Sequence, residues 1–189
     1  MRNKKILTLC ESAVMLALAF ALSYVKLFEM PLGGSITLAS MLPIMLISVK
    51  YGTRVGVSTA FVYSLTQLFQ GFMDGTIYWA MDGGVLVIAI LFDYVVPFTL
   101  IGFAGAFKSR GEKGIYAGML LVVFLRFISH FATGVSIWKQ WTPEGWNTYL
   151  YSLAYNGGFL LPDFLILLVV AIFILRVREM RRLLNIDKR

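Results

Sequence analysis

Long apolar stretches, interrupted only by short polar turns, constrain this chain more than any other feature of its sequence. Hydrophobic residues make up 59% of the chain and mean hydropathy is +0.78, whereas charged residues make up only 14%. A typical soluble domain carries about 25% charged residues and presents a mostly polar exterior. The composition therefore excludes a soluble domain and a disordered chain, and it indicates a protein that folds in a lipid bilayer.

Six apolar stretches can be delimited, and we interpret each as a membrane-spanning helix. They cover residues 6–24, 37–49, 55–69, 84–107, 115–137 and 150–176. Four of them have about the 20 residues that a helix needs to cross the hydrocarbon layer. The second and third are short, and we expect them to be tilted or sheltered by neighbouring helices. No strand-like alternation competes with helices. The sequence predicts an all-α, polytopic membrane protein whose six transmembrane helices form a single membrane-embedded domain over residues 1–189.

The positive charges lie mainly on one side of these predicted spans. Most of the 17 lysines and arginines occupy the N-terminus, the turns after the second and fourth spans, and the C-terminal tail, namely Arg2, Lys4, Lys5, Lys50, Arg54, Lys108, Arg110, Lys113, Arg176, Arg178, Arg181, Arg182, Lys188 and Arg189. The opposite loops hold only Lys26 and Lys139, beside Glu29, Asp74, Asp82 and Glu144. Because basic residues stay on the cytoplasmic side, we expect a multi-pass cell-membrane protein with both termini cytoplasmic.

The same distribution explains the net charge of +7 without a nucleic-acid partner, since the basic residues lie within a few positions of helix ends. The N-terminus has the charged start of a secretory leader, but its apolar run is too long, so we interpret it as an uncleaved first span. Cys10 is the only cysteine, which excludes a disulfide and a multi-cysteine metal site. We expect no metal and no cofactor.

Aromatic residues gather at the outer end of the predicted bundle. All four tryptophans and several tyrosines belong to it, namely Trp79, Trp138, Trp141, Trp146, Tyr78, Tyr149, Tyr151 and Tyr155. Two interpretations remain open. The residues could be a one-sided anchoring belt, although such belts normally occupy both interfaces. They could also wall an outward-facing pocket for a flat or cationic ligand, through ring stacking and cation–π attraction.

Polar side chains inside the spans carry the stronger functional signal, because burying them in hydrocarbon is costly. Asp93 lies about 15 Å from the outer end of the fourth span at 1.5 Å per residue. In the fifth span, Arg126, His130, Gly134 and Trp138 follow at four-residue intervals and share one helix face.

Asn156 and Asp163 share a face of the sixth span in the same way. Each polar residue has a structural alternative: Asp163 and Arg126 could join helices, His130 could be a packing residue, and Asn156 could hydrogen-bond between helices. Together, these polar and aromatic residues converge on the outer half of the bundle and indicate a small-molecule site.

Catalysis has less support from the sequence. No metalloprotease, serine-hydrolase or phosphate-loop motif is present, so we expect neither an enzyme nor a chain that hydrolyses ATP by itself. The glycines at 102 and 105 are expected to serve helix packing.

In the first span, Ala13, Ala17 and Ala21 recur at four-residue spacing. Small residues at that interval let another helix approach closely, either from the same chain or from a partner subunit.

Several of these segments resemble one family of membrane proteins, the thiamine-specific S components of energy-coupling factor transporters. The resemblance is carried by Phe92-Asp93-Tyr94, by LRFISHFATG at residues 125–134 and by YSLAYNG at residues 151–157. PLGGS at 31–35 and MLPI at 41–44 are similar as well. The resemblance extends from the alanine stripe to the end of the sixth span.

This resemblance implies a six-helix vitamin-binding subunit that works with a transmembrane coupling subunit and two cytosolic ATPases. The ligand is expected to be thiamine, held at an outward-facing site by Asp93, Tyr94, His130, Gly134, Trp138, Tyr151 and Asn156. The stripe of Ala13, Ala17 and Ala21 is the expected contact to the coupling subunit. Some members place a tryptophan over the site where this chain has Gly34, so Tyr78 or Trp79 is expected to cover it instead.

Three alternatives stay open at this point. The same architecture could take another small heteroaromatic vitamin or precursor, such as hydroxymethylpyrimidine. An intramembrane enzyme could use Asp93, His130 and Arg126 as acid–base groups. A structural or assembly subunit would bind no ligand at all.

Overall fold

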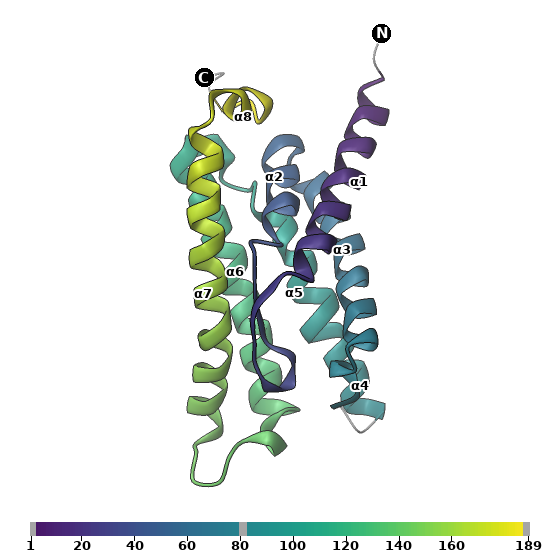
Figure 1. The fold of residues 1–189 in the computed structure, drawn as a ribbon, viewed down its shortest axis with the longest axis vertical. Coiled ribbons are helices and arrows are strands. Elements are labelled where there is room, and N and C mark those ends of the chain that lie inside the picture. The colour runs from purple at the N-terminus through teal and green to yellow at the C-terminus, as the bar shows by residue number, and fades with distance from the viewer. Residues whose placement is uncertain (1–2, 80–82, 187–189) are drawn as a thin grey trace.

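The computed structural model describes residues 3–79 and 83–186, and this part of the chain forms six helical rods that lie side by side (Figure 1). Five rods are α1 (Lys4–Ser23), α2 (Leu42–Tyr51), α3 (Thr53–Met73), α6 (Gly111–Ser136) and α7 (Thr148–Arg176). The sixth is built from α4 (Gly83–Ala89), the π-helical segment η3 (Ile90–Val95), α5 (Val96–Leu100) and the 3₁₀ turn η4 (Ile101–Phe103). The predicted all-α fold with six helices is therefore confirmed. Arg2, Asp82, Lys188 and Arg189 lie outside the described residues.

The lengths of the rods differ. Three stretches of the described chain are long and apolar enough to cross a membrane, namely Lys4–Ser23, Gly83–Ser136 and Thr148–Arg176, and the second of these contains two rods. Helix α2 has only 10 residues, about 15 Å of rise. Every residue from Leu42 to Val49 is buried, so neighbouring helices shelter this short helix, as expected from the sequence.

The expectation of an uninterrupted second helix over residues 37–49 is wrong. Thr37 belongs instead to strand β2 (Ser35–Thr37), which pairs antiparallel with β1 (Lys26–Glu29). The turn η1 (Pro31–Gly33) joins them, with Leu32 at φ 68° and Gly33 at φ 96°. Proline and glycine suit this turn, and positive φ at two successive residues is incompatible with a continuing helix.

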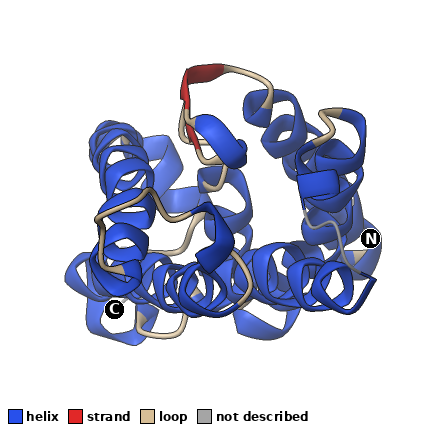
Figure 2. Cartoon of the chain, turned by 90° about the horizontal axis from the view of Figure 1, so that it is seen from below, coloured by secondary structure: helices blue, strands red, loops and turns tan. Residues whose placement is uncertain are grey.

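The hairpin fills one side of the bundle beside α7, with most of β1 exposed and the end of β2 buried (Figure 1). Figure 2 shows the helices nearly end-on, with the short strands in red beside them. Non-helical backbone survives at membrane depth only where protein or a cavity surrounds it. Asp163 of α7 supplies part of that environment, because its Oδ1 accepts hydrogen bonds from the backbone nitrogen of Thr37 at 2.8 Å and from Thr37 Oγ1 at 2.9 Å.

Close helix packing depends on glycine, as the sequence indicated. A Cβ at Gly102 would lie 2.4 Å from the backbone of Val57 in α3, and one at Gly105 would lie 2.3 Å from the carbonyl oxygen of Ser48 in α2. Ser48 Oγ also accepts from the nitrogen of Gly105 at 2.9 Å. The fourth rod therefore packs backbone to backbone against α2 and α3 around Gly102 and Gly105.

The start of α1 and the end of α7 lie at the same end of the bundle, called the termini end below (Figure 1). A short helix, α8 (Arg178–Leu183), follows α7 there. On α1, Glu11 Oε2 accepts from Lys50 Nζ at 2.5 Å and from Tyr51 Oη at 2.8 Å, which joins α1 to the end of α2. An even number of rods with both ends together fits the predicted arrangement.

Candidate ligand-binding site

A cavity of about 170 Å³ lies between the β1–β2 hairpin and the walls formed by α3, η3, α6 and α7. Seven of the eight residues expected to bind a ligand line it, namely Asp93, Tyr94, His130, Gly134, Trp138, Tyr151 and Asn156. They come from three different rods and from the loop after α6. The structure therefore brings them to one cavity, which is the juxtaposition that a binding site requires.

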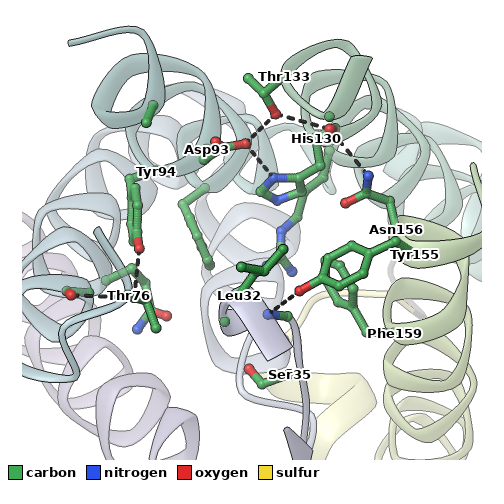
Figure 3. A pocket seen from close by; sticks show the side chains of 18 of the residues that line it. Leu32, Ser35, Thr76, Asp93, Tyr94, His130, Thr133, Tyr155, Asn156 and Phe159 are labelled. Atoms are coloured by element: carbon green, nitrogen blue, oxygen red, sulfur yellow. Dashed lines mark hydrogen bonds and ion pairs between the residues drawn. The ribbon is translucent and has the colours of Figure 1, made fainter. Parts of the chain in front are cut away.

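Asp93 stands at the centre of this group (Figure 3). Its Oδ1 accepts from Thr133 Oγ1 at 2.5 Å and lies 3.0 Å from His130 Nδ1, while its Oδ2 accepts from Trp138 Nε1 at 2.7 Å. The π-helical turn of η3 carries Asp93, and such local widenings often mark functional sites. Three directional contacts hold the carboxylate in place without a neighbouring lysine or arginine ion pair among the described residues.

Two basic side chains in the cavity keep buried nitrogens without a partner in the described chain. They are His130 Nε2 and Arg126 Nε. The guanidinium of Arg126 lies over the Phe98 ring at 4.3 Å, and its Nη1 lies 3.0 Å from Met41 Sδ, so it forms no close ion pair with Asp163. Buried polar atoms are almost always hydrogen-bonded, and orphans in a cavity therefore indicate a place for ligand or water.

Aromatic side chains of α7 line one wall of the cavity. Tyr151, Tyr155 and Phe159 recur every four residues, with ring centroids 6.0 Å and 5.9 Å apart. His130 faces this row, with its ring 6.1 Å from that of Phe159. This wall offers π faces to a flat or cationic ligand.

Gly134 and Asn156 set the contact between α6 and α7. A Cβ at Gly134 would lie 2.1 Å from Ser152 Oγ, so only glycine permits this approach. Asn156 Nδ2 donates to the carbonyl oxygens of Ser152 at 2.9 Å and His130 at 3.3 Å. Its Oδ1 remains for a donor in the cavity.

The opposite wall comes from α3 and the turn η2 (Thr76–Trp79). Tyr94 Oη lies 3.1 Å from Thr76 Oγ1, and a Cβ at Gly71 would lie only 2.4 Å from the same hydroxyl. Tyr94 thus lies along this wall, packed against Gly71 of α3 and directed at Thr76 (Figure 3). Gln67 and Gln70 line this wall too, with Gln70 Oε1 accepting from Ser23 Oγ at 2.9 Å.

Lys26 of the hairpin bridges two carboxylates at the cavity. Its Nζ lies 2.7 Å from Glu29 Oε1 and 2.9 Å from Asp74 Oδ2. Two carboxylates therefore face one ammonium, and the formal charge of this cluster is negative.

Tyr78 is the expected site residue that the structure keeps away from the cavity. Its side chain is 65% exposed and its ring contacts Phe72. Trp79, Trp141 and Trp146 do not line the cavity either: Trp79 packs edge-on against Trp141 at 5.0 Å, and Trp146 against Tyr151 at 6.2 Å. Trp138 is therefore the only tryptophan of the described chain that lines it.

Several lining residues were not among the eight expected ligand contacts, although Tyr155 was counted with the aromatic residues of the outer end. Thr133, one turn after His130, binds Asp93, and Tyr155 holds the hairpin turn, because its hydroxyl donates to the carbonyl oxygen of Pro31 and accepts from the nitrogen of Gly34 at 3.1 Å. A Cβ at Gly34 would lie 2.7 Å from the ring of Phe159, so the α7 aromatics occupy the space that a larger residue would need. The four-residue spacing of Tyr151, Tyr155 and Phe159 was the available signal.

The alanine stripe lies away from the cavity. Ala13, Ala17 and Ala21 are all exposed on α1, next to the exposed side chains of Val14 and Leu18. Only 11% of the most apolar stretch of α1 is buried against the rest of the protein. The stripe is thus free of the internal helix contact that the sequence had left open.

Comparison with known proteins agrees with this architecture. A sequence model of the thiamine transporter protein family matches residues 9–183. The chain belongs to this family. It is 31% identical to thiamine transporter ThiT of Bacillus subtilis, over 99% of this chain and 98% of that protein, and 25% identical to ThiT of Lacticaseibacillus paracasei, over 93% and 90%.

A solved structure of ThiT from Listeria monocytogenes has the same fold as this family member. The TM-score is 0.76 at 22% sequence identity, over 96% of this chain and 99% of that one. These relatives are transporters rather than enzymes, and the family assignment makes the present chain a membrane transport protein. The enzyme and ligand-free assembly alternatives lose their support.

Replacing Tyr155 with phenylalanine tests how the hairpin is held. The change removes both hydrogen bonds of the hydroxyl and keeps the ring contacts, so we expect a loss of about 1–3 kcal/mol of hairpin stability. Backbone amides of residues 32–35 should then exchange faster with deuterium, while those of α6 keep their rates. Tyr151→Phe is the matched control, because no hydrogen bond of its hydroxyl is described; equal exchange in both variants would contradict the assigned role.

Proposed function

We propose that this chain is the substrate-binding subunit of a thiamine importer of the energy-coupling factor type, with its site open to the extracellular side. The single observation that carries the proposal is the cavity around Asp93, in which a fixed carboxylate, an orphaned imidazole nitrogen and aromatic rings face one space. Membership of the thiamine transporter family and the names of the relatives support thiamine as the substrate.

The chemistry of the cavity suits the two rings of thiamine. The thiazolium ring carries a permanent positive charge, which the carboxylate of Asp93 and the aromatic faces of Trp138 and Tyr151 would attract. The aminopyrimidine ring offers an amino group and ring nitrogens, for which Asn156 Oδ1 and His130 Nε2 provide partners. Gly134 lets α7 approach α6 closely enough to bring Asn156 beside His130.

The charge at the hairpin favours the same ligand class. Glu29 and Asp74 outnumber Lys26 in the cluster beside the cavity, so a cation entering there meets net negative charge. A neutral heteroaromatic precursor, such as hydroxymethylpyrimidine, would gain less from this cluster and from Asp93. We therefore rank thiamine above its neutral fragments.

Calorimetric titration of the purified full chain with thiamine and with hydroxymethylpyrimidine tests the substrate. We expect thiamine to bind more tightly and to quench the fluorescence of Trp138, whereas Trp138→Phe should remove most of the quenching. Trp146→Phe is the matched control, because Trp146 is exposed outside the cavity. Tighter binding of the neutral precursor would overturn the assignment of thiamine.

Asp93→Asn removes the negative charge while keeping the size of the side chain. The loss should be about 2–5 kcal/mol, the range for a charged hydrogen bond in a buried site, or about 30- to several-thousand-fold in thiamine affinity. Asp93→Glu keeps the charge and should retain much more affinity, and circular dichroism of both variants checks the fold. Unchanged thiamine affinity in Asp93→Asn would remove Asp93 from the site.

The energy for import would come from other subunits. The sequence has no phosphate-binding loop, and α1 presents an exposed stripe of small residues that another helix can approach closely. We assign Ala13, Ala17 and Ala21 to the contact with a transmembrane coupling subunit, which carries two cytosolic ATPases. The termini end, with its many lysines and arginines, would then face the cytoplasm of the cell.

Ala17→Trp places a bulky ring in the middle of this stripe. Uptake by the assembled transporter should be abolished, because the coupling helix could no longer approach, while thiamine binding by the detergent-solubilised subunit persists. Leu165→Trp places the same ring at an exposed position on α7, away from the stripe, and should leave uptake intact. If Ala17→Trp also lost ligand binding, misfolding would explain the result and the docking assignment would fail.

A further inference from the structure

Helix α8 is held crosswise over the termini end of the bundle (Figure 1). Arg181 Nη1 lies 2.6 Å from Glu112 Oε2 of α6 and donates to the carbonyl oxygen of Leu175 at 3.4 Å. Lys108 Nζ donates to the carbonyl oxygen of Leu184 at 2.7 Å, and Leu184 itself is 3% exposed. These contacts fix α8 to the ends of α6 and α7, so α8 is part of the fold rather than a loose tail.

The side chains that this attachment leaves outside are mainly cations. Arg178 and Arg182 lie one turn apart on α8 and are exposed, as is Arg176 at the end of α7. Arg110 and Lys113, at the start of α6, are exposed as well. These five residues, called the basic rim below, take part in no ion pair among the described residues.

Carboxylates near the basic rim do not offset it. Glu112 is engaged by Arg181 and by Tyr116 Oη at 2.9 Å, which leaves Glu179 as the exposed carboxylate of α8. Among the residues that the structure describes, five cations therefore accompany one exposed carboxylate, Glu179, at a surface that Arg181 and Lys108 hold in a defined shape. Such a surface attracts multivalent or repeated anions.

Apolar side chains are exposed beside these cations. Val177 is 47% exposed and Leu183 is 55% exposed, on either side of the arginines of α8. In a chain whose helices span a bilayer, a short helix lying across their ends occupies the level of the lipid headgroups. Arginines next to exposed aliphatic side chains are the pattern of a helix that rests on a membrane surface.

We propose that the basic rim binds the phosphate headgroups of anionic phospholipids. Arg178 and Arg182 contact the headgroup phosphate from α8, Arg110 and Lys113 from α6, and Val177 and Leu183 lie against the first carbons of the acyl chains. Guanidinium groups suit phosphate because they donate two parallel hydrogen bonds. A partner protein with an acidic surface is the competing occupant, and the exposed aliphatic side chains beside the arginines favour lipid.

The full chain in a neutral detergent can be titrated with short-chain phosphatidylglycerol, short-chain phosphatidylcholine or free glycerol phosphate while the melting temperature is followed. We expect phosphatidylglycerol to raise the melting temperature most, and added salt to weaken that effect through screening. Stabilisation by glycerol phosphate equal to that by phosphatidylglycerol would overturn the proposal, since the surface would then bind small anions. Equal stabilisation by both lipids would overturn it too.

The variant Arg110→Gln/Arg178→Gln/Arg182→Gln removes three cations and leaves the Arg181–Glu112 contact in place. Its apparent affinity for phosphatidylglycerol should fall by about tenfold or more. The matched variant with lysine at these positions keeps the charge and should retain most of the preference, and Lys139→Gln, at the opposite end, should behave as the parent. The melting temperature of each variant without lipid separates loss of binding from loss of fold.

Two results with the glutamine variant would contradict the lipid assignment. An unchanged preference for phosphatidylglycerol would show that the basic rim does not bind the headgroup. An unchanged preference together with lost association with the rest of the transporter would assign the surface to a protein partner instead. The lipid measurements need no thiamine, so they can succeed or fail independently of the proposed transport function.

Discussion

The hydrogen bonds between Asp163 and Thr37 are the interaction on which the rest of the structure depends. They let a stretch of non-helical backbone lie inside a bundle of apolar helices, where an unpaired amide would cost several kcal/mol. Because the hairpin occupies that volume, α2 is limited to 10 residues. The space between the hairpin and the surrounding rods is the cavity. Asp163 thus stabilises the hairpin, and it lines the cavity as well.

The charged side chains of the site differ in the partners that they contact. Asp93 is held by Thr133, His130 and Trp138, none of which neutralises it as a permanent cation would, so its charge remains for a ligand. Arg126 is buried on the ring of Phe98, and Lys26 is engaged by two carboxylates. The cavity therefore holds a carboxylate with no lysine or arginine ion pair among the described residues, while Lys26 is paired and Arg126 keeps one unpartnered nitrogen; this arrangement suits a positively charged substrate.

The two ends of the bundle also carry different kinds of side chain. The end with the cavity is rich in aromatic rings and hydrogen-bonding groups, whereas the termini end is rich in arginine and lysine attached to short, fixed elements. In the functions proposed above, the first end selects the small molecule, the second rests on anionic lipid, and α1 docks the coupling subunit. Ligand selection and docking would then use separate surfaces of one small chain.

The sequence by itself determined the class of fold, the approximate limits of five of the six helices and seven of the residues that line the cavity, because hydropathy and four-residue spacing are local properties of a helix. Periodicity could not predict the β1–β2 hairpin, because residues 37–41 continue directly into the apolar sequence of α2. Thr37 is held in place instead by Asp163, more than a hundred positions away in the sequence. Nor could it separate Tyr78 from Tyr155: both are tyrosines at the outer end, and only the packing of η2 and α7 directs one toward solvent and the other into the cavity. Tertiary structure also decided that Asp93 contacts His130 and Trp138, because these residues lie 37 and 45 positions further along the chain and meet Asp93 only through the packing of η3 against α6.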